Sequence, residues 1–480
     1  MKSIIKGKIL LKKINILAYM YIIILLLMNF IRIFDNCFWG DEYYSIRLAR
    51  MSINGLIQAT AGDVHPPLYY IWVKVLYRLL GDTSVIYHFS GFFPYALMIV
   101  TAYAWGKKRL GLIATIVMIT MSSLMPIAVT ENVEVRMYSL AAFFVYVSYI
   151  SLYEIINYNK PGGWSIFCIA SLGAAYSHYY ALISVAFFYV VLIFLSIKMQ
   201  EYRCKASMAC TVTVVGYLPW FFKLLSAFQR NSNNWWLNGI PTIGECIRYL
   251  FKYKWLNIIF FVVLFIFAFN QFKEYKLKMV KEIGGVNLKQ FEKISICGET
   301  IWIVSGIVSV LGTMIVGIGV SHVFRPLFQA KYCFPVSAVA YVILGFCISK
   351  LIYRRNFFII FIIVLLISTL PDYISIYQSD RALDADTAEI LRTAMPSSDA
   401  VIYTNIPSYG LFDYYYPQAS TTYGEGYVDA LGINSEIWVF WTEEFEFNQE
   451  IERHGYNVTK CYEGNFPNGL YCYVYVILRE

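Results

Sequence analysis

Long apolar stretches recur along most of this chain, and they constrain its fold more strongly than any other feature. A membrane-spanning helix needs about 20 consecutive, mostly apolar residues. Eleven stretches reach or approach this length, at 14–34, 84–105, 110–128, 136–156, 163–177, 179–197, 207–225, 255–271, 298–319, 331–350 and 356–371. Because 59% of the residues are hydrophobic and 15% are charged, the composition excludes a purely cytosolic enzyme, a nucleic-acid-binding protein and a disordered chain. We therefore expect an α-helical polytopic membrane protein with about eleven transmembrane helices.

Charge separates this membrane body from the end of the chain. Residues 1–371 contain 34 Lys and Arg against 14 Asp and Glu, whereas residues 372–480 contain 5 against 17. Such a change in composition indicates a domain boundary. The sequence therefore predicts a basic, apolar membrane domain that is followed by an acidic, soluble domain.

The positions of the basic residues predict the orientation of the protein. Lysines and arginines concentrate in alternate loops, for example Lys107–Arg109 and the lysines between Lys273 and Lys293. The positive-inside rule places such loops in the cytoplasm. The basic N-terminus resembles a signal peptide but lacks a small-residue cleavage site, so we expect an uncleaved first span. The prediction is a multi-pass plasma-membrane protein with a cytoplasmic N-terminus and an extracytoplasmic C-terminal domain.

The C-terminal region has the pattern of a small α/β domain. A helix is predicted over 384–395, and short strands are predicted over 399–404, 436–441, 457–462 and 470–477. The last two strands form a hairpin around Asn468 and Gly469, a pair that favours tight turns. Cys461 and Cys472 fall in these two strands, and whether they form a disulfide stays open. The domain contains no catalytic motif that we recognise.

The first extracytoplasmic loop, residues 35–83, carries the acids that best fit a catalytic role. Asp41 and Glu42 follow the first span by a few residues, within FWGDEYYSIRLAR (38–50). Asp63 lies in a second motif, where His-Pro-Pro breaks the chain before a helix rich in aromatic residues. The alternative is that these acids are ordinary solvated loop residues. The loop is long and rich in Gly, Pro and aromatic residues, so we take both motifs as candidates for proton abstraction.

Other polar residues lie near the predicted outer ends of spans. The positive-inside rule does not explain basic residues on that side. Arg136 lies in MPIAVTENVEVRMYSL (125–140), and Arg325 and Lys331 lie in RPLFQAKY between two later spans. Binding a phosphate would explain cations on this side of the membrane, although Arg136 alone could be an interface anchor. His178 interrupts a continuous apolar run, so it is either a functional residue or a histidine satisfied by neighbouring hydroxyls.

These residue types fit one kind of chemistry. Carboxylates can abstract a proton, cations can hold a phosphate, and aromatic side chains can line a cavity at the outer leaflet. A sugar linked to a polyprenyl phosphate needs all three, since its tail partitions into the bilayer and its phosphate is charged. Because phosphate is a good leaving group, one carboxylate that deprotonates an acceptor hydroxyl would suffice. This scheme is a direct displacement with inversion, unlike the two-carboxylate scheme of most glycosidases.

Four motifs resemble those of a known superfamily. GDEYYSI (40–46), DVHPPLYY (63–70), VRMYSL (135–140) and AKYCFPV (330–336) resemble motifs of the GT-C membrane glycosyltransferases. The chain looks most like the bacterial dolichyl-phosphate-mannose–protein mannosyltransferase and aminoarabinose transferase clan, and within it like RgtA/B/C/D-like members. The resemblance covers roughly residues 15–350, in the same order of motifs. It implies a GT-C-like transmembrane domain over 1–371 and a soluble extracytoplasmic α/β domain over 372–480.

The resemblance also implies roles for individual residues. Asp41 corresponds to the proposed catalytic base, and Glu42 and Asp63 complete the predicted catalytic set. The residues expected to bind the donor phosphate are Arg136, Tyr138, Arg325 and Lys331, and those expected to line the substrate site are His65, Tyr69, His178 and Tyr332. Members commonly have arginine where this chain has Lys331, which keeps the charge but loses the bidentate fork. Some members use a divalent cation and others do not; its ligands could come from Asp41, Glu42, Asp63 and His65.

We therefore expect a membrane glycosyltransferase that moves a sugar from a polyprenyl-phosphate donor to a lipid, glycan or protein acceptor at the outer face. Its partners would be these substrates and membrane lipids, without nucleic acid. A flippase or transporter for lipid-linked saccharides is one alternative, but it predicts charges deep in many spans and repeat symmetry, which the sequence lacks. A non-catalytic assembly protein is another alternative, and it would need no acid at Asp41. The identities of the sugar and the acceptor stay open.

Overall fold

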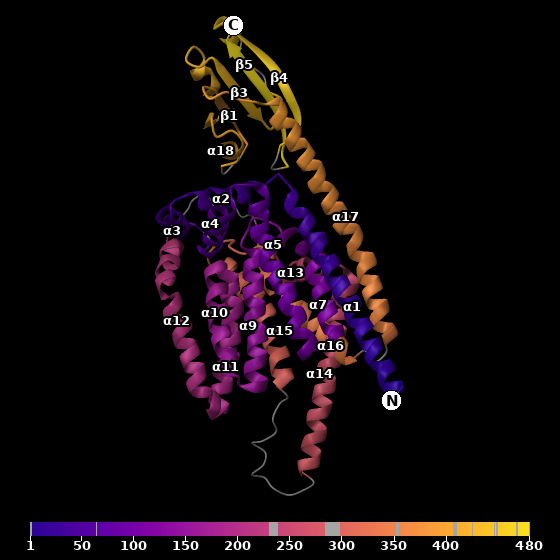
Figure 1. Cartoon of the computed structure of the whole chain (residues 1–480). Helices are drawn as coiled ribbons and strands as arrows, with labels where there is room; N and C mark the ends of the chain where they lie inside the picture. Colours follow the sequence, from indigo (N-terminus) through magenta and orange to yellow (C-terminus); the bar gives the residue numbers. More distant parts are fainter. Residues whose placement is uncertain are drawn as a thin grey trace. The chain divides into compact units, whose positions relative to one another are not determined.

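Helices occupy the apolar stretches of the chain (Figure 1). The structure is a computed structural model, and it describes all residues except 1, 64, 230–238, 284–297, 352–354, 407–409, 425, 446, 448–449, 467–468 and 480. In this described part, nine helical segments are long and apolar enough to cross a membrane. They comprise α1 (Lys2–Phe30), α5 (Ser84–Thr101) continued by η2 (Ala102–Gly106) and α6 (Lys107–Arg109), α9 (Tyr138–Tyr158), α11 (Tyr179–Lys198), α12 (Gln200–Gln229), α14 (Lys254–Ile283), α15 (Gly298–Val323), η4 (Ala330–Val336) with α16 (Ser337–Leu351), and α17 (Arg355–Thr393). The predicted polytopic helical fold is confirmed.

The other two predicted spans are shorter helices. α7 (Leu112–Leu124) has 13 residues and α10 (Pro161–Ser177) has 17. α7 is buried from Ala114 to its end, and it packs against α16. Gly345 permits this packing, because a Cβ at that position would lie 2.5 Å from the carbonyl oxygen of Ala114. Close backbone approach at a small residue is typical of membrane helices. All eleven predicted stretches are thus helical, and nine of them have the length of a span.

Short helices fill the segments between the spans. The predicted first loop is largely helical and consists of η1 (Ile31–Phe34), α2 (Gly40–Arg50), α3 (Ile53–Gly62) and α4 (Leu68–Leu80), while later segments contain α8 (Pro126–Glu131) and α13 (Ile243–Phe251). α4 begins directly after the two prolines, as expected, and it buries Tyr69 and Tyr70 completely. The first loop is therefore a packed part of the protein.

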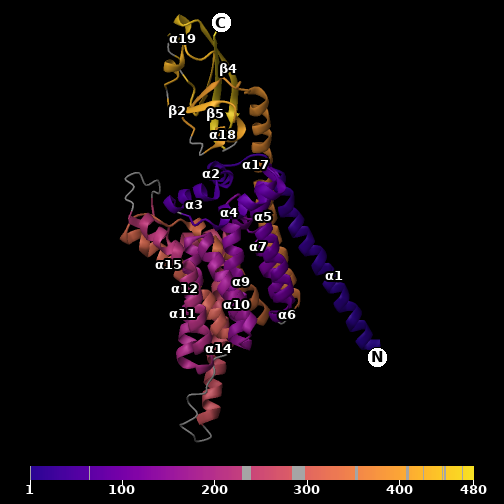
Figure 2. The same ribbon diagram turned by 60° about the vertical axis from the view of Figure 1, so that its left-hand side comes forward.

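The end of the chain forms one five-stranded sheet (Figure 2). Its strands are β1 (Val401–Thr404), β2 (Ser420–Tyr423), β3 (Glu436–Trp441), β4 (Tyr456–Asn465) and β5 (Tyr471–Arg479), in the order β2-β1-β3-β5-β4. β1 is parallel to β2 and β3, and β5 is antiparallel to β3 and β4. Two short helices, α18 (Leu411–Tyr415) and α19 (Glu450–Arg453), and the turn η5 (Gly426–Ala430) connect the strands. The predicted α/β character is confirmed; the sequence analysis missed β2.

The hairpin of β4 and β5 contains Cys461 and Cys472. Cys472 on β5 lies opposite Gly464, whereas Cys461 lies at a shift in register of β4, and both thiols are free. Gly469 in the turn has a φ of +79°, which glycine adopts without strain. Some predicted features lie outside the described residues, namely Asn468 of this turn, Lys289 and Lys293 of the basic loop, and Val64 of the DVHPP motif.

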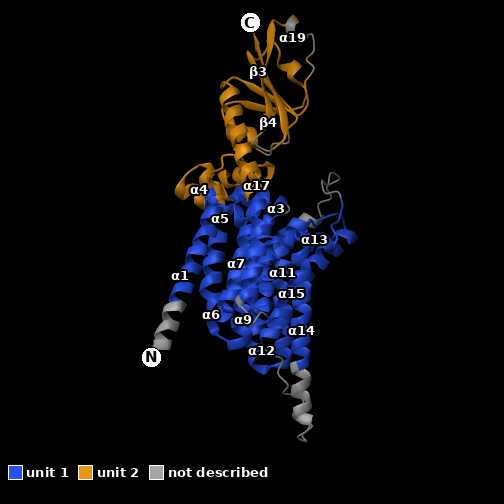
Figure 3. Cartoon of the chain, turned by 90° about the vertical axis from the view of Figure 1, so that its right-hand side faces the viewer, with its two compact units in different colours: residues 1–31, 54–72, 89–373 blue, residues 32–53, 73–88, 374–480 orange. Residues whose placement is uncertain are grey.

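The described chain divides into two units (Figure 3). Unit 1 comprises Met1–Ile31, Asn54–Trp72 and Phe89–Tyr373, and unit 2 comprises Arg32–Ile53, Val73–His88 and Ile374–Glu480. α17 runs through the predicted boundary at residue 371 without a break, although Pro371 lies inside it. The expected helix over 384–395 is the end of α17. The change from a basic to an acidic composition therefore falls inside α17. A single helix can continue from an apolar into a polar environment without ending.

Candidate active site

Six of the predicted site residues come together in unit 1. This polar cluster consists of His65, Arg136, Tyr138, His178, Lys331 and Tyr332, which are contributed by four separate parts of the sequence. The ring of His178 lies at its centre, with ring centroids 5.5 Å from His65, 5.5 Å from Tyr138 and 5.2 Å from Tyr332. All members except Lys331 are buried, and Lys331 is half-buried. The sequence prediction that these residues share a site is therefore consistent with their geometry.

His178 owes its position to a break between two helices. α10 ends at Ser177 and α11 begins at Tyr179, while His178 itself is extended, with φ −156° and ψ 136°. Its Nδ1 accepts a hydrogen bond of 3.2 Å from the backbone N–H of Tyr180 and so caps α11. The ring is therefore fixed at the junction of the two helices. The predicted spans 163–177 and 179–197 are thus two separate helices, divided at His178.

Two cations give the cluster its charge. Arg136 lies in the turn between α8 and α9, and the Nζ of Lys331 lies 5.8 Å from the centroid of the Tyr138 ring. Burial and the charge of Arg136 lower the pKa of His65 well below its usual value, and they lower the pKa of His178 to about 3. Both imidazoles are thus neutral, and the positive charge resides on Arg136 and Lys331.

The Nδ1 of His65 and the hydroxyl oxygen of Tyr138 are buried polar atoms of the cluster that have no hydrogen-bond partner among the described residues. Buried polar groups are nearly always hydrogen-bonded, and those that are not require an explanation. A bound group with several acceptor oxygens, next to two cations, would satisfy both atoms. The cluster therefore has the properties of an anion site.

A buried carboxylic acid lies beside this cluster. Glu131 at the end of α8 accepts a hydrogen bond of 3.0 Å from the hydroxyl of Tyr249 on α13. Burial and the neighbouring Glu134 raise the pKa of Glu131 well above 4.5, while Lys331 acts in the opposite direction. The sequence analysis noted neither the role of Glu131 nor Tyr249, because Tyr249 lies in a separate short helix with no recognisable motif. Tyr180, whose ring stacks on Tyr332 at 5.3 Å, was also missed.

Glu131→Gln is expected to reduce the pH dependence of stability. Because the folded-state pKa of Glu131 is raised, its contribution to stability is complete below about pH 4.5 and is lost as the pH rises through the raised value. One such proton changes the free energy of unfolding by at most about 1.4 kcal/mol per pH unit. Thermal unfolding in detergent from pH 5 to 9 should show a steeper loss of stability in the wild type than in Glu131→Gln.

Glu245→Gln is the matched control for this experiment. Glu245 is exposed on α13, and hydrogen bonds from Thr242 lower its pKa. Its contribution to stability is therefore present above pH 4.5 and is lost as the pH falls, which is the opposite sign. Parallel pH profiles of the wild type and Glu131→Gln would contradict the raised pKa of Glu131.

Asp63, Tyr69 and Arg325 also lie in unit 1. Asp63 is half-buried just beyond α3, where its charge acts on the hydroxyl of Tyr179. The hydroxyl of Tyr69 lies 2.7 Å from the Oγ of Ser90 on α5, so Tyr69 connects α4 to α5. Arg325 is half-buried between α15 and η4. The catalytic, lining and phosphate-binding roles assigned to these three residues stay predictions.

Asp41 and Glu42 lie in unit 2, in the first turn of α2. Glu42 is buried, and its Oε2 accepts a hydrogen bond of 3.0 Å from the backbone N–H of Trp39, so it caps its own helix. Its other oxygen lies 4.0 Å from the Nδ1 of His88. Asp41 is half-buried and thus more accessible than Glu42. These contacts favour a structural role for Glu42 and leave Asp41 as the acid of this motif that a substrate could reach.

A search for metal ligands gives no candidate. Within the described ranges, no group of three or more His, Cys, Asp or Glu side chains is placed to hold a metal ion.

The fold of the chain is similar to that of two solved structures. Both are crystal structures of ArnT from Cupriavidus metallidurans. The apo structure matches with a TM-score of 0.50 and 9% identity, and the structure bound to undecaprenyl phosphate matches with 0.52 and 10%. Each comparison covers 95% of this chain and 97% of ArnT. At such low identity the likeness shows the fold alone. No family model and no curated protein matches the sequence.

Proposed function

We propose that this protein is a glycosyltransferase that uses a polyprenyl-phosphate sugar as donor. The observation that carries the proposal is the polar cluster, with two cations and the unpartnered polar atoms of His65 and Tyr138. A phosphate supplies acceptor oxygens for each of these groups. The likeness of the fold to ArnT, which has been crystallised with undecaprenyl phosphate, supports a lipid-linked phosphate in particular.

In the proposed reaction, Asp41 accepts the proton of the acceptor hydroxyl. The hydroxyl oxygen then forms a bond to the anomeric carbon of the sugar, and the bond from that carbon to the phosphate oxygen breaks. The polyprenyl phosphate leaves with the electron pair, and Arg136 and Lys331 stabilise its charge. Displacement in one step inverts the anomeric configuration. The proposal retains Asp63 and Glu42 as the other acids of the predicted catalytic set, with Glu42 stabilising the helix that carries Asp41.

The proposal includes the location of the reaction. Residues 1–371 form the transferase domain in the plasma membrane, the N-terminus is cytoplasmic, and residues 372–480 lie outside. The acceptor is a lipid, glycan or protein that is accessible from that side. The basic cytoplasmic loops of the sequence support this orientation.

The test uses the purified full-length protein in lipid nanodiscs. A defined undecaprenyl-phosphate sugar is added with a lipid and glycan extract, and mass spectrometry follows the products. We expect an acceptor that gains the mass of one sugar, together with free undecaprenyl phosphate in equal amount. Movement of intact donor across a proteoliposome membrane, without any such product, would overturn the proposal in favour of a flippase.

A further inference from the structure

The helix that carries Asp41 is covered by aromatic residues from the C-terminal part of unit 2. Tyr43 on α2 is almost completely buried. The centroid of its ring lies 5.9 Å from that of Tyr414 and 5.8 Å from that of Tyr415, both on α18. Aromatic pairs at such separations stabilise a packing arrangement beyond the area they bury. α18 therefore packs against α2 at Tyr43.

Tyr414 contacts both ends of α2. Its ring packs edge-on against Phe38, two residues before the helix, with centroids 5.4 Å apart. At the other end, the guanidinium carbon of Arg50 lies 4.9 Å from the centroid of the Tyr414 ring. Arg50 is also held by an ion pair of 2.8 Å with Asp82. The Tyr414 ring thus contacts a side chain just before the helix that bears Asp41 and a side chain from the last residue of that helix.

The turn before α18 permits this close approach. Gly410 has a φ of +109°, a conformation that residues with a Cβ rarely adopt. A Cβ added to it would lie 3.5 Å from the Cδ of Arg47 on α2, so the turn and α2 are in contact. Gly410 therefore contacts α2 at the start of α18, a few residues before Tyr414 and Tyr415.

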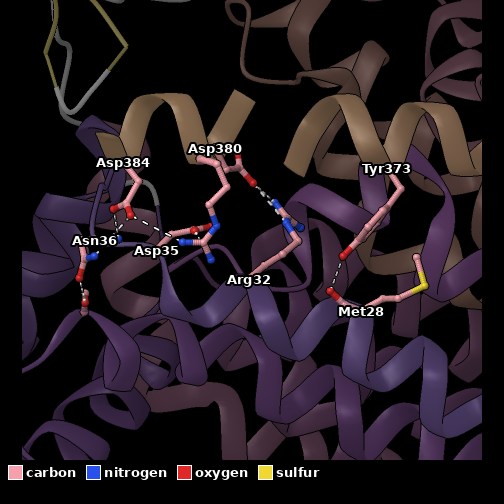
Figure 4. A network of polar contacts seen from close by, with 9 residues as sticks. Met28, Arg32, Asp35, Asn36, Tyr373, Asp380 and Asp384 are labelled. Carbon is pink, nitrogen blue, oxygen red and sulfur yellow. Dashed lines mark hydrogen bonds and ion pairs between the residues drawn. The ribbon is translucent and has the colours of Figure 1, made fainter. Parts of the chain in front are cut away.

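The segment that leads into α2 is held by α17 (Figure 4). Arg32 forms an ion pair of 2.8 Å with Asp380, and Asp35 forms one of 3.3 Å with Arg381. The backbone N–H of Asn36 donates a hydrogen bond of 2.7 Å to Asp384. The carbonyl oxygen of Asn36 accepts a bond of 2.8 Å from the hydroxyl of Tyr415. Both backbone groups of Asn36 are therefore fixed by the C-terminal part of unit 2.

α2 depends on such contacts for its position. It has 11 residues, and isolated helices of this length are marginally stable in water. Its own cap by Glu42 stabilises the helix but does not orient it. Its orientation depends on the elements packed on it and on the segment before it, which include α17 and α18 as well as Asp82 and His88.

We propose that residues 374–480 position the Asp41 helix for the reaction, with Tyr414 as the principal positioning residue. This inference rests on the proposed function, because it makes the position of Asp41, the base of that reaction, depend on the C-terminal domain. A displacement of about 1 Å in a catalytic group can reduce a rate by about 10²-fold. Loss of the Tyr414 ring should therefore affect the chemical step and leave donor binding unchanged.

The test compares three variants of the full chain. Tyr414→Ala is expected to lower kcat by about 10- to 100-fold with the KM for the donor unchanged. Tyr414→Phe should restore kcat, because the contacts with Phe38, Tyr43 and Arg50 involve the ring. Tyr423→Ala is the control, since Tyr423 is an exposed tyrosine on β2 of the C-terminal sheet. An unchanged kcat in Tyr414→Ala would overturn the inference.

Amide hydrogen exchange separates this inference from the proposed function. Tyr414→Ala should accelerate exchange over residues 40–50 by at least tenfold, whereas Tyr414→Phe and Tyr423→Ala should not. This measurement requires no substrate, so it remains informative if the wild type transfers no sugar. Unchanged exchange over 40–50 in Tyr414→Ala would show that Tyr414 does not hold α2.

Discussion

Asp41→Asn is expected to lower the rate of sugar transfer by about 10²- to 10⁴-fold while the affinity for the donor stays the same. Asparagine has the size of aspartate but cannot accept the proton of an acceptor hydroxyl. The substitution therefore removes the base and leaves the cations that hold the phosphate. The measurement is kcat in nanodiscs at saturating donor, together with equilibrium binding of undecaprenyl phosphate to the same preparation.

Asp413→Asn provides the control for this experiment. Asp413 is an exposed acid in the first turn of α18, so the same change of charge is made at a comparable position of a helix in unit 2. It should leave the rate unaltered. Retained turnover in Asp41→Asn would remove Asp41 as the base, and a parallel loss of donor affinity would indicate instead that Asp41 contributes to donor binding.

Arg136→Ala is expected to weaken binding of the polyprenyl phosphate by about 10²-fold. A bidentate arginine makes two charge-assisted hydrogen bonds, each worth about 1.5–3 kcal/mol, and about 1.4 kcal/mol corresponds to a factor of ten in affinity. Since Arg136 is buried, this interaction is poorly screened by water. Titration of the purified protein with undecaprenyl phosphate measures the change.

A lysine at the same position distinguishes charge from geometry. Arg136→Lys retains the positive charge but loses the planar fork, so we expect about a tenfold loss of affinity. Arg203→Ala on α12 serves as the control, because Arg203 is exposed and its Nε donates a hydrogen bond to the backbone oxygen of Ser196. An affinity for Arg136→Ala equal to that of the wild type would exclude Arg136 from the phosphate site.

The helical fold could be predicted because apolar length is a local property of the sequence. Each span satisfies its own backbone hydrogen bonds, so its existence does not depend on neighbours. α7 shows where this reasoning is insufficient: it is a 13-residue helix enclosed by other helices, and its length follows from that packing. Strand β2 was missed for a related reason, since its four residues are largely exposed and have no apolar alternation.

The candidate site was predictable where a polar residue departs from the expected pattern. Arg136 and Lys331 stood out as cations at the predicted outer ends of spans, His178 stood out because it interrupts an apolar run, and the structure places all three in one cluster with His65. Tyr249 carried no such signal, because a tyrosine in an amphipathic segment is unremarkable until its partner Glu131 is known. The dependence of α2 on Tyr414 joins residues that are far apart in sequence, which no local pattern reveals.

The contacts of Arg32 and Asn36 with α17 can form only late in the synthesis of the protein. Arg32 and Asp380 are 348 residues apart, as are Asn36 and Asp384. A ribosome that adds about 5–20 residues per second needs roughly 20–70 s to cover this interval. During that time the segment before α2 lacks its ion pair and hydrogen bond with α17. A nascent chain therefore completes the packing around Asp41 only after α17 has been made.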